Sequence, residues 1–289
     1  MGCSNSKATK VAEPTKKPEE RHQPESGDQI QQLESPAQSR KNSEVSFQKQ
    51  NETPKSKMED ELEKLCQTVK DNKITVGYWG IKGRAYPIRL LLTYKNIEFE
   101  DRCYYKDTAP VWFGEDKPKI GKMAELNFPS IPFVVDKDNQ DETGDDKPTI
   151  IFQSIAVQRY LGRKYNLCAQ TDKECYLEDM FEGIFKDIGD AMQKAVFGTE
   201  EDMLKWSEAF DNVWGPIESH MASHKYIAGD NLVALDFVLF SHMEMVENYK
   251  PNCFDGYEQL KRFRACIMED KNVCQYVESR KKQPFFPPK

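Results

Sequence analysis

The spacing of apolar residues separates a polar start of the chain from a body that can form a core. Residues 1–57 contain few large apolar side chains and are rich in Gln, Glu, Lys, Ser and Pro, so they are predicted to form a disordered tether. Residues 58–72 carry apolar side chains at helical spacing, which predicts a short amphipathic helix or a linker. From residue 73 onward, strand and helix patterns follow one another.

Residues 73–168 are predicted to form an α/β domain. Residues 73–79 are rich in β-branched and aromatic side chains, as strands are, and glycines and then apolar residues at helical spacing follow them. Further strands are predicted at 99–105, 128–136 and 149–153, and a last helix at 154–165. This order is a βαβ unit followed by a hairpin and a helix.

Residues 169–289 are predicted to form an all-helical domain, because strand-like alternation stops there. Helices are expected at 176–196, 200–223, 235–247 and 257–268. The second of these carries an apolar stripe made of Trp206, Phe210, Trp214 and Ile217. The proline-rich segment 281–289 cannot be helical and is expected to lie along a surface.

Composition and charge exclude several function classes. The formal net charge is -7 and no basic stripe accompanies it, which argues against nucleic-acid binding. The 8 cysteines are scattered without a CxxC pair, as is typical of free thiols in a reducing compartment. His220 and His224 have a zinc-like spacing without a third ligand, and the acidic stretch 138–146 lacks the calcium-loop pattern. No metal site is therefore predicted.

The first residues fit the N-myristoylation pattern. Gly2 becomes the N-terminus when Met1 is removed, and Ser6 lies four residues further on. One acyl chain anchors a protein only marginally, and a palmitoyl group on Cys3 would provide the second anchor. The expectation is attachment to membrane lipid on the cytoplasmic face, together with a cytosolic pool. No run of about 18 apolar residues predicts a membrane span. An unmodified, disordered start is the alternative.

Three features suit the binding of a small peptide with a reactive anion. Tyr78 stands at the junction of the first strand with a helix, where its hydroxyl can donate to a thiolate or an oxyanion. Ile131–Pro132 is a candidate cis bond that leaves the backbone of Ile131 free to pair with an extended peptide. Gln153 and Ser154, at a strand end and a helix start, can bind a carboxylate. Taken singly, each feature is more often structural.

In this order, the motifs resemble those of the cytosolic-type glutathione transferases, most closely the mu class with some sigma-like features. The resemblance covers about residues 73–283. Its motifs lie at residues 77–83, 128–132, 153–156, 163–168, 227–230 and 235–237. It implies a thioredoxin-like N-terminal domain that binds glutathione and a helical C-terminal domain that completes an electrophile pocket.

The resemblance also implies roles for individual residues. Tyr78 would be catalytic and donate a hydrogen bond to the sulfur of glutathione, which is a co-substrate, so no cofactor is implied. Glutathione would contact Trp79, Trp112, Lys117, Ile131, Pro132, Gln153, Ser154 and Asp187. Asp187 would reach into the partner's site in a homodimer. Arg84 and Phe197 would line the electrophile pocket. Both differ from the residues usual in the family, so they leave substrate preference open.

The expected function is the conjugation of glutathione thiolate to hydrophobic electrophiles by a membrane-tethered enzyme. One alternative is a catalytically weak scaffold or ligand carrier with the same fold. Another is a glutathione-dependent isomerase or peroxidase. Conjugation assays separate the first alternative from the expected function, and a substrate screen separates the second.

Overall fold

The computed structural model describes residues 73–138 and 147–287. The predicted tether at 1–57, the segment 58–72, the acylation residues Gly2 and Cys3, and the acidic stretch from residue 139 to 146 lie outside the described residues. Within the described part of the chain, no helix combines the length and the apolar character that crossing a bilayer requires.

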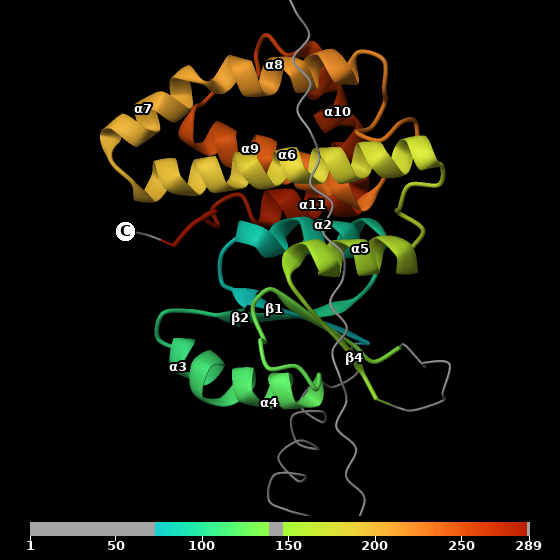
Figure 1. Cartoon of the computed structure of the whole chain (residues 1–289), viewed down its shortest axis with the longest axis vertical. Coiled ribbons are helices and arrows are strands. Elements are labelled where there is room, and N and C mark those ends of the chain that lie inside the picture. Colours follow the sequence, from blue (N-terminus) through green and yellow to red (C-terminus); the bar gives the residue numbers. More distant parts are fainter. Residues whose placement is uncertain (1–72, 139–146, 288–289) are drawn as a thin grey trace, which may run out of the picture. The chain divides into compact units, whose positions relative to one another are not determined.

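A four-stranded mixed sheet forms the centre of the N-terminal region, in the order β2-β1-β3-β4 (Figure 1). The strands are β1 (Ile74–Trp79), β2 (Phe99–Tyr104), β3 (Phe133–Asp136) and β4 (Thr149–Phe152). β1 and β2 are parallel because helix α2 (Tyr86–Tyr94) connects them by a crossover. β3 is antiparallel to both β1 and β4. The predicted βαβ unit and hairpin are confirmed.

Helices cover both faces of the sheet. α2 and α5 (Ser154–Lys164) contact each other on one face. Short helical segments lie on the other face (Figure 1), namely α3 (Ala109–Val111), the π-helical turn η2 (Trp112–Asp116) and α4 (Lys117–Met123). The short helical turn η1 (Gly83–Ala85) leads directly into α2. No helix was predicted between residues 105 and 128, because Pro110, Gly114 and Pro118 hide the helical pattern.

The C-terminal region is helical, as predicted, but it differs from the expectation by a break in one helix and by one additional helix. It contains α6 (Asp172–Phe197), α7 (Glu200–Glu208), α8 (Phe210–Met221), α9 (Ala234–Tyr249), α10 (Glu258–Met268) and α11 (Lys271–Ser279). The single helix predicted at 200–223 is interrupted at Ala209, which no glycine or proline marks in the sequence. The additional helix is α11, which begins where the Asp270 side chain accepts the Val273 N–H at 2.9 Å.

Helix α9 joins the two regions. It contacts α2, α5 and α6, and most of its side chains are buried. Its N-terminus begins after Val233, which has no side-chain acceptor. Instead, the fully buried carboxylate of Asp236 accepts the N–H groups of Ile227 at 2.9 Å and Val233 at 2.8 Å. Burial raises the pKa of Asp236 to about 7, although the two N–H groups act in the opposite direction.

Candidate active site

Three sequence motifs leave the sheet at the same edge. Gly77, Phe133 and Phe152 form a row across β1, β3 and β4 in the strand register. The residues next to this row along the chain are Tyr78, Pro132 and Gln153. Because β3 runs antiparallel to both neighbours, the end of β1, the start of β3 and the end of β4 coincide. The fold therefore brings together motifs that lie up to 75 residues apart in the sequence.

The hydroxyl of Tyr78 keeps its proton free for a ligand. The Tyr78 side chain is buried, and its Oη accepts the Arg84 N–H at 3.2 Å, so the phenol proton is not used in this bond. Burial raises the pKa of Tyr78, while the Arg84 N–H and the charges of Arg84 and Arg89 lower it in part. The net direction is upward, so the phenol is protonated at neutral pH and can donate.

Gly83 permits this hydrogen bond. Its φ is +42°, and a Cβ atom at this position would lie 2.7 Å from Tyr78 Cε1 and 2.8 Å from Oη. The backbone of the turn thus passes directly over the phenol ring. Only glycine combines the left-handed backbone with such a close approach.

The second and third motifs contact each other. The peptide bond Ile131–Pro132 is cis, as predicted. Gln153 Nε2 donates to Ser130 Oγ at 3.3 Å, which links the end of β4 to the segment before the cis bond. Gln153 has a φ of +70°, an unfavourable conformation for a non-glycine residue that costs on the order of 1–3 kcal/mol. Such strain is concentrated at functional sites.

The N-terminus of α5 adds donors to this edge. α5 begins at Ser154, and none of the described side chains caps its first turn, which also contains no acidic residue. The first N–H groups of a helix need partners, and the helix dipole favours an anion there. The position of Ser154 after the strained Gln153 therefore suits the binding of a carboxylate.

Trp112 and Lys117 lie on the other face of the sheet from α2. Trp112 is only 2% exposed, and its ring stacks on Phe133 with a centroid distance of 5.7 Å. Its neighbour Phe113 is 57% exposed, packs on Trp79 at 6.1 Å and has Lys117 Nζ 5.9 Å from its ring. The exposed aromatic side chain beside Trp79 is therefore Phe113. Phe113 was not predicted from the sequence, because only the π-helical turn determines which of the two adjacent aromatic residues is buried.

Arg84, Asp187 and Phe197 are all exposed and face the solvent around α6. Arg84 forms an ion pair with Asp190 of α6 at 3.7 Å. Phe197, at the end of α6, packs edge-on against Phe286 with a centroid distance of 5.6 Å. These contacts link the turn after β1, helix α6 and the C-terminal segment.

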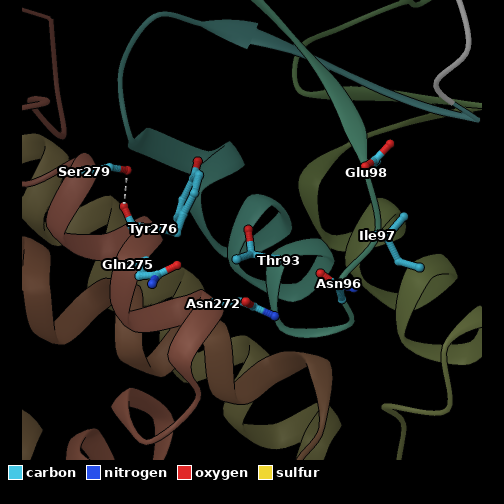
Figure 2. Close-up of a pocket in the computed structure, with 8 residues that line it drawn as sticks. All are labelled: Thr93, Asn96, Ile97, Glu98, Asn272, Gln275, Tyr276 and Ser279. Carbon is cyan, nitrogen blue, oxygen red and sulfur yellow. Dashed lines mark hydrogen bonds between the residues drawn. The ribbon is translucent and has the colours of Figure 1, made fainter.

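Other features of the described residues lie apart from this edge. A cavity of about 380 Å³ is formed between α2 and α11 (Figure 2). It is lined by Thr93, Asn96, Ile97, Glu98, Asn272, Gln275, Tyr276 and Ser279. It contains none of the predicted site residues. The rings of His220 and His224 stack at 4.2 Å, and each ring also makes a hydrogen bond to a backbone carbonyl.

Comparison with known proteins identifies relatives of both regions. Residues 178–280 match a family model described as "Glutathione S-transferase, C-terminal domain". The chain is 31% identical to Glutathione S-transferase Mu 1 of Bos taurus over 216 residues, which cover 72% of this chain and 92% of that protein. It is 29% identical to Glutathione S-transferase Mu 2 of Homo sapiens over 218 residues, covering 73% and 93%.

A solved structure supports the same relationship. The fold is similar to that of an Onchocerca volvulus Pi-class glutathione S-transferase, with a TM-score of 0.61 and 25% sequence identity. The similarity covers 74% of this chain and 98% of that chain.

Proposed function

The chain belongs to the glutathione S-transferase family, and from that premise we propose that it conjugates glutathione to hydrophobic electrophiles with Tyr78 as the catalytic residue. Homology to Mu-class enzymes establishes a thioredoxin-like N-terminal domain followed by a helical C-terminal domain. One observation carries the proposal: the free hydroxyl proton of Tyr78, the cis bond at Pro132 and the strained Gln153 converge at one edge of the sheet.

Tyr78 would act by stabilising the thiolate of glutathione. A free thiol with a pKa near 8.5 is only about 3% ionised at pH 7. A hydrogen bond from Tyr78 Oη–H to the sulfur favours the anion, and each unit by which the thiol pKa falls gives up to about tenfold more thiolate. The thiol proton passes to solvent, the sulfur forms a bond to the electrophilic carbon, and the leaving group departs with its electron pair.

The remaining edge residues would hold the tripeptide. Ser154, Gln153 and the N-terminal amides of α5 suit the γ-glutamyl carboxylate. The backbone of Ile131, just before β3 and beside the end of β1, suits the cysteinyl residue. Trp79 and Lys117 would border the glycine end, with Phe113 between them. Trp112 backs this wall from the core side, where its ring stacks on Phe133.

The electrophile pocket would lie between the turn after β1 and the C-terminal segment. Phe197 and Phe286 offer apolar rings that contact each other, and Arg84 adds a positive charge tied to Asp190. This combination fits an electrophile with an apolar body. A substrate screen would identify the electrophile itself.

A homodimer is part of this proposal. α6 exposes Tyr176, Met180 and Ile184 on successive turns, with exposed fractions of 51%, 59% and 38%. Phe128, in the segment between α4 and β3, is 64% exposed. Such apolar surface is typical of a protein interface. Asp187, on the same helix, would then reach the site of the partner subunit.

Two further parts of the proposal are the domain bounds and the membrane anchor. Domain bounds at 73–168 and 169–289 are supported by the end of α5 at Lys164 and the start of α6 at Asp172. Membrane attachment through acylated Gly2 and Cys3 is supported by the motif alone, in a segment outside the described residues. The intact mass of the N-terminal peptide tests the membrane attachment, because an unmodified Gly2 and Cys3 would exclude the anchor.

The substitution Tyr78→Phe tests the proposed function. It removes the hydroxyl while keeping the buried ring, so we expect glutathione binding to persist and kcat for a nitroaryl halide to fall by roughly ten- to a hundredfold at pH 6.5. Unchanged turnover would exclude the role of Tyr78. Binding of glutathione by the unmodified protein without product formation would favour a ligand carrier over an enzyme.

A further inference from the structure

Lys82 places a buried positive charge in the turn that follows β1. Its side chain is 5% exposed, and Nζ lies 3.2 Å from Oε2 of Glu244 on α9. The rings of Tyr86 and Phe285 lie 4.9 Å and 4.6 Å from Nζ. A buried ammonium group is tolerated only when it is paired, so this ion pair ties the turn to helix α9.

The surroundings of the ion pair hold the turn from several sides. The Glu244 carboxylate also accepts the Tyr86 hydroxyl at 3.1 Å, and its Oε1 lies 3.7 Å from Arg264 Nη2. Arg264 pairs in turn with Glu247 at 2.6 Å. The backbone N–H of Lys82 donates to the carbonyl of Pro284 at 2.8 Å, so the C-terminal segment fixes the same residue.

The turn controls the hydrogen bond that Tyr78 accepts. Arg84, two residues after Lys82, donates its N–H to Tyr78 Oη at 3.2 Å. This distance is at the long end of the range for N–H···O bonds, so a small displacement of the turn breaks the bond. A hydroxyl that accepts one hydrogen bond is polarised and becomes a stronger donor in the next.

We propose that the Lys82–Glu244 ion pair positions the turn so that the Arg84 N–H remains bonded to Tyr78 Oη, which strengthens the hydrogen bond from Tyr78 to the glutathione sulfur. This inference rests on the proposed function of Tyr78. Lys82 is thus a positioning residue. The charges that influence the pKa of Tyr78 belong to Arg84 and Arg89, so Lys82 acts through the geometry of the turn.

The test compares Lys82→Met, which removes the ammonium group, with Lys82→Arg, which retains a positive charge. The readout is the pKa of enzyme-bound glutathione, taken from thiolate absorbance and from the pH profile of kcat at saturating glutathione. In Lys82→Met we expect this pKa to rise by about 0.5–1 unit, which lowers kcat about three- to tenfold at pH 6.5 and little at high pH. In Lys82→Arg the pKa of bound glutathione should stay close to its value in the unmodified protein. KM for glutathione should be similar in all of these proteins.

The same substitution in a Tyr78→Phe protein separates a positioning role of Lys82 from general damage to the fold. In a Tyr78→Phe protein, Lys82→Met should cause no further rise in the pKa of bound glutathione, because the residue through which Lys82 acts is absent. The proposal would be overturned if Lys82→Met raised the pKa of bound glutathione equally in the Tyr78→Phe protein. It would also be overturned if Lys82→Met caused no rise in the protein that retains Tyr78. If Tyr78→Phe alone leaves the thiol pKa unchanged, the proposed function fails as well.

Glu244→Gln keeps the inference testable if Lys82→Met does not fold. Glutamine retains the size and one acceptor but removes the charge that pairs with Lys82. We expect the same direction of change in the thiol pKa, with circular dichroism showing a folded protein. A folded Glu244→Gln protein with an unchanged thiol pKa would contradict the role of the ion pair.

Discussion

At the scale of single residues, the site depends on close contacts that only one residue type permits. Gly83 combines a φ of +42° with a position where a Cβ would lie 2.8 Å from Tyr78 Oη. We therefore expect Gly83→Ala to displace the turn, to reduce the free energy of unfolding by about 1–3 kcal/mol and to lower kcat. Chemical unfolding and conjugation assays measure both effects.

Gly215 provides a matched control for this substitution. It lies inside α8, and apart from its chain neighbours and its own helix backbone no heavy atom lies within 4 Å of the position that a Cβ would take. Gly215→Ala should leave kcat unchanged, while the clash of a Cβ with the ring of the following Pro216 opposes the gain in stability that alanine brings to a helix. An equal loss of kcat in Gly83→Ala and Gly215→Ala would show that the turn at Gly83 has no special role.

At the scale of elements, the start of α9 is held by a side chain within the helix. Asp236 accepts two backbone N–H groups, and asparagine can accept them only through one oxygen, so Asp236→Asn leaves a buried donor without a partner. We expect the free energy of unfolding to fall by about 1–3 kcal/mol at neutral pH. Chemical unfolding of both proteins across a pH series measures the loss.

The raised pKa of Asp236 determines how the stability loss in Asp236→Asn changes with pH. Because burial raises the pKa of Asp236 to about 7 from 3.8, the folded protein binds the proton more tightly than the unfolded chain does. Its contribution to stability is fully present below about pH 4 and is lost as the pH rises through 7. The stability gap between wild type and Asp236→Asn should therefore widen as the pH falls from 8 to 5. A constant gap would contradict the raised pKa.

Asp202, in the capping box of α7, is the control, because its pKa is shifted in the opposite direction to that of Asp236. Hydrogen bonds from the Thr199 N–H and hydroxyl lower its pKa to about 2 from 3.8. Its contribution is present above pH 3.8 and is lost as the pH falls toward 2. Asp202→Asn should therefore leave the pH dependence between 5 and 8 as it is in the wild type.

At the scale of the whole molecule, the exposed stripe on α6 predicts a dimer. The chain has a mass of 33.5 kDa, and light scattering should give twice this value for the unmodified protein. Met180→Asp puts a carboxylate into the proposed interface, where desolvation of the charge opposes association, so the mass should fall to that of one chain.

Leu204→Asp is the matched control for the dimer. Leu204 is 58% exposed, nearly as much as Met180, but it lies on α7 and outside the stripe. This variant should keep the dimer mass. A single-chain mass for the unmodified protein would contradict the proposed homodimer, and with it the role of Asp187 across the interface.

The order of the strands and of most helices, and the position of Tyr78, Pro132 and Gln153 at element ends, followed from the sequence, because both depend on local patterns. Strand and helix periodicities persist along the chain, and Tyr78, Pro132 and Gln153 each lie at an element end that turn residues mark. The break at Ala209 was missed because an apolar stripe continues through it. Helix α11 lies beyond the last helix that the pattern predicted.

Only the tertiary structure decided which side chains are exposed at the candidate site and which are buried. The rotation of the π-helical turn buries Trp112 and exposes Phe113, although the two are adjacent aromatic residues. The pairs of Lys82 with Glu244 and of Arg84 with Asp190 join residues that are more than 100 positions apart. Such contacts depend on how α6 and α9 pack beside the sheet. Local residue patterns contain no information on that packing, so no reading of the sequence alone could assign these partners.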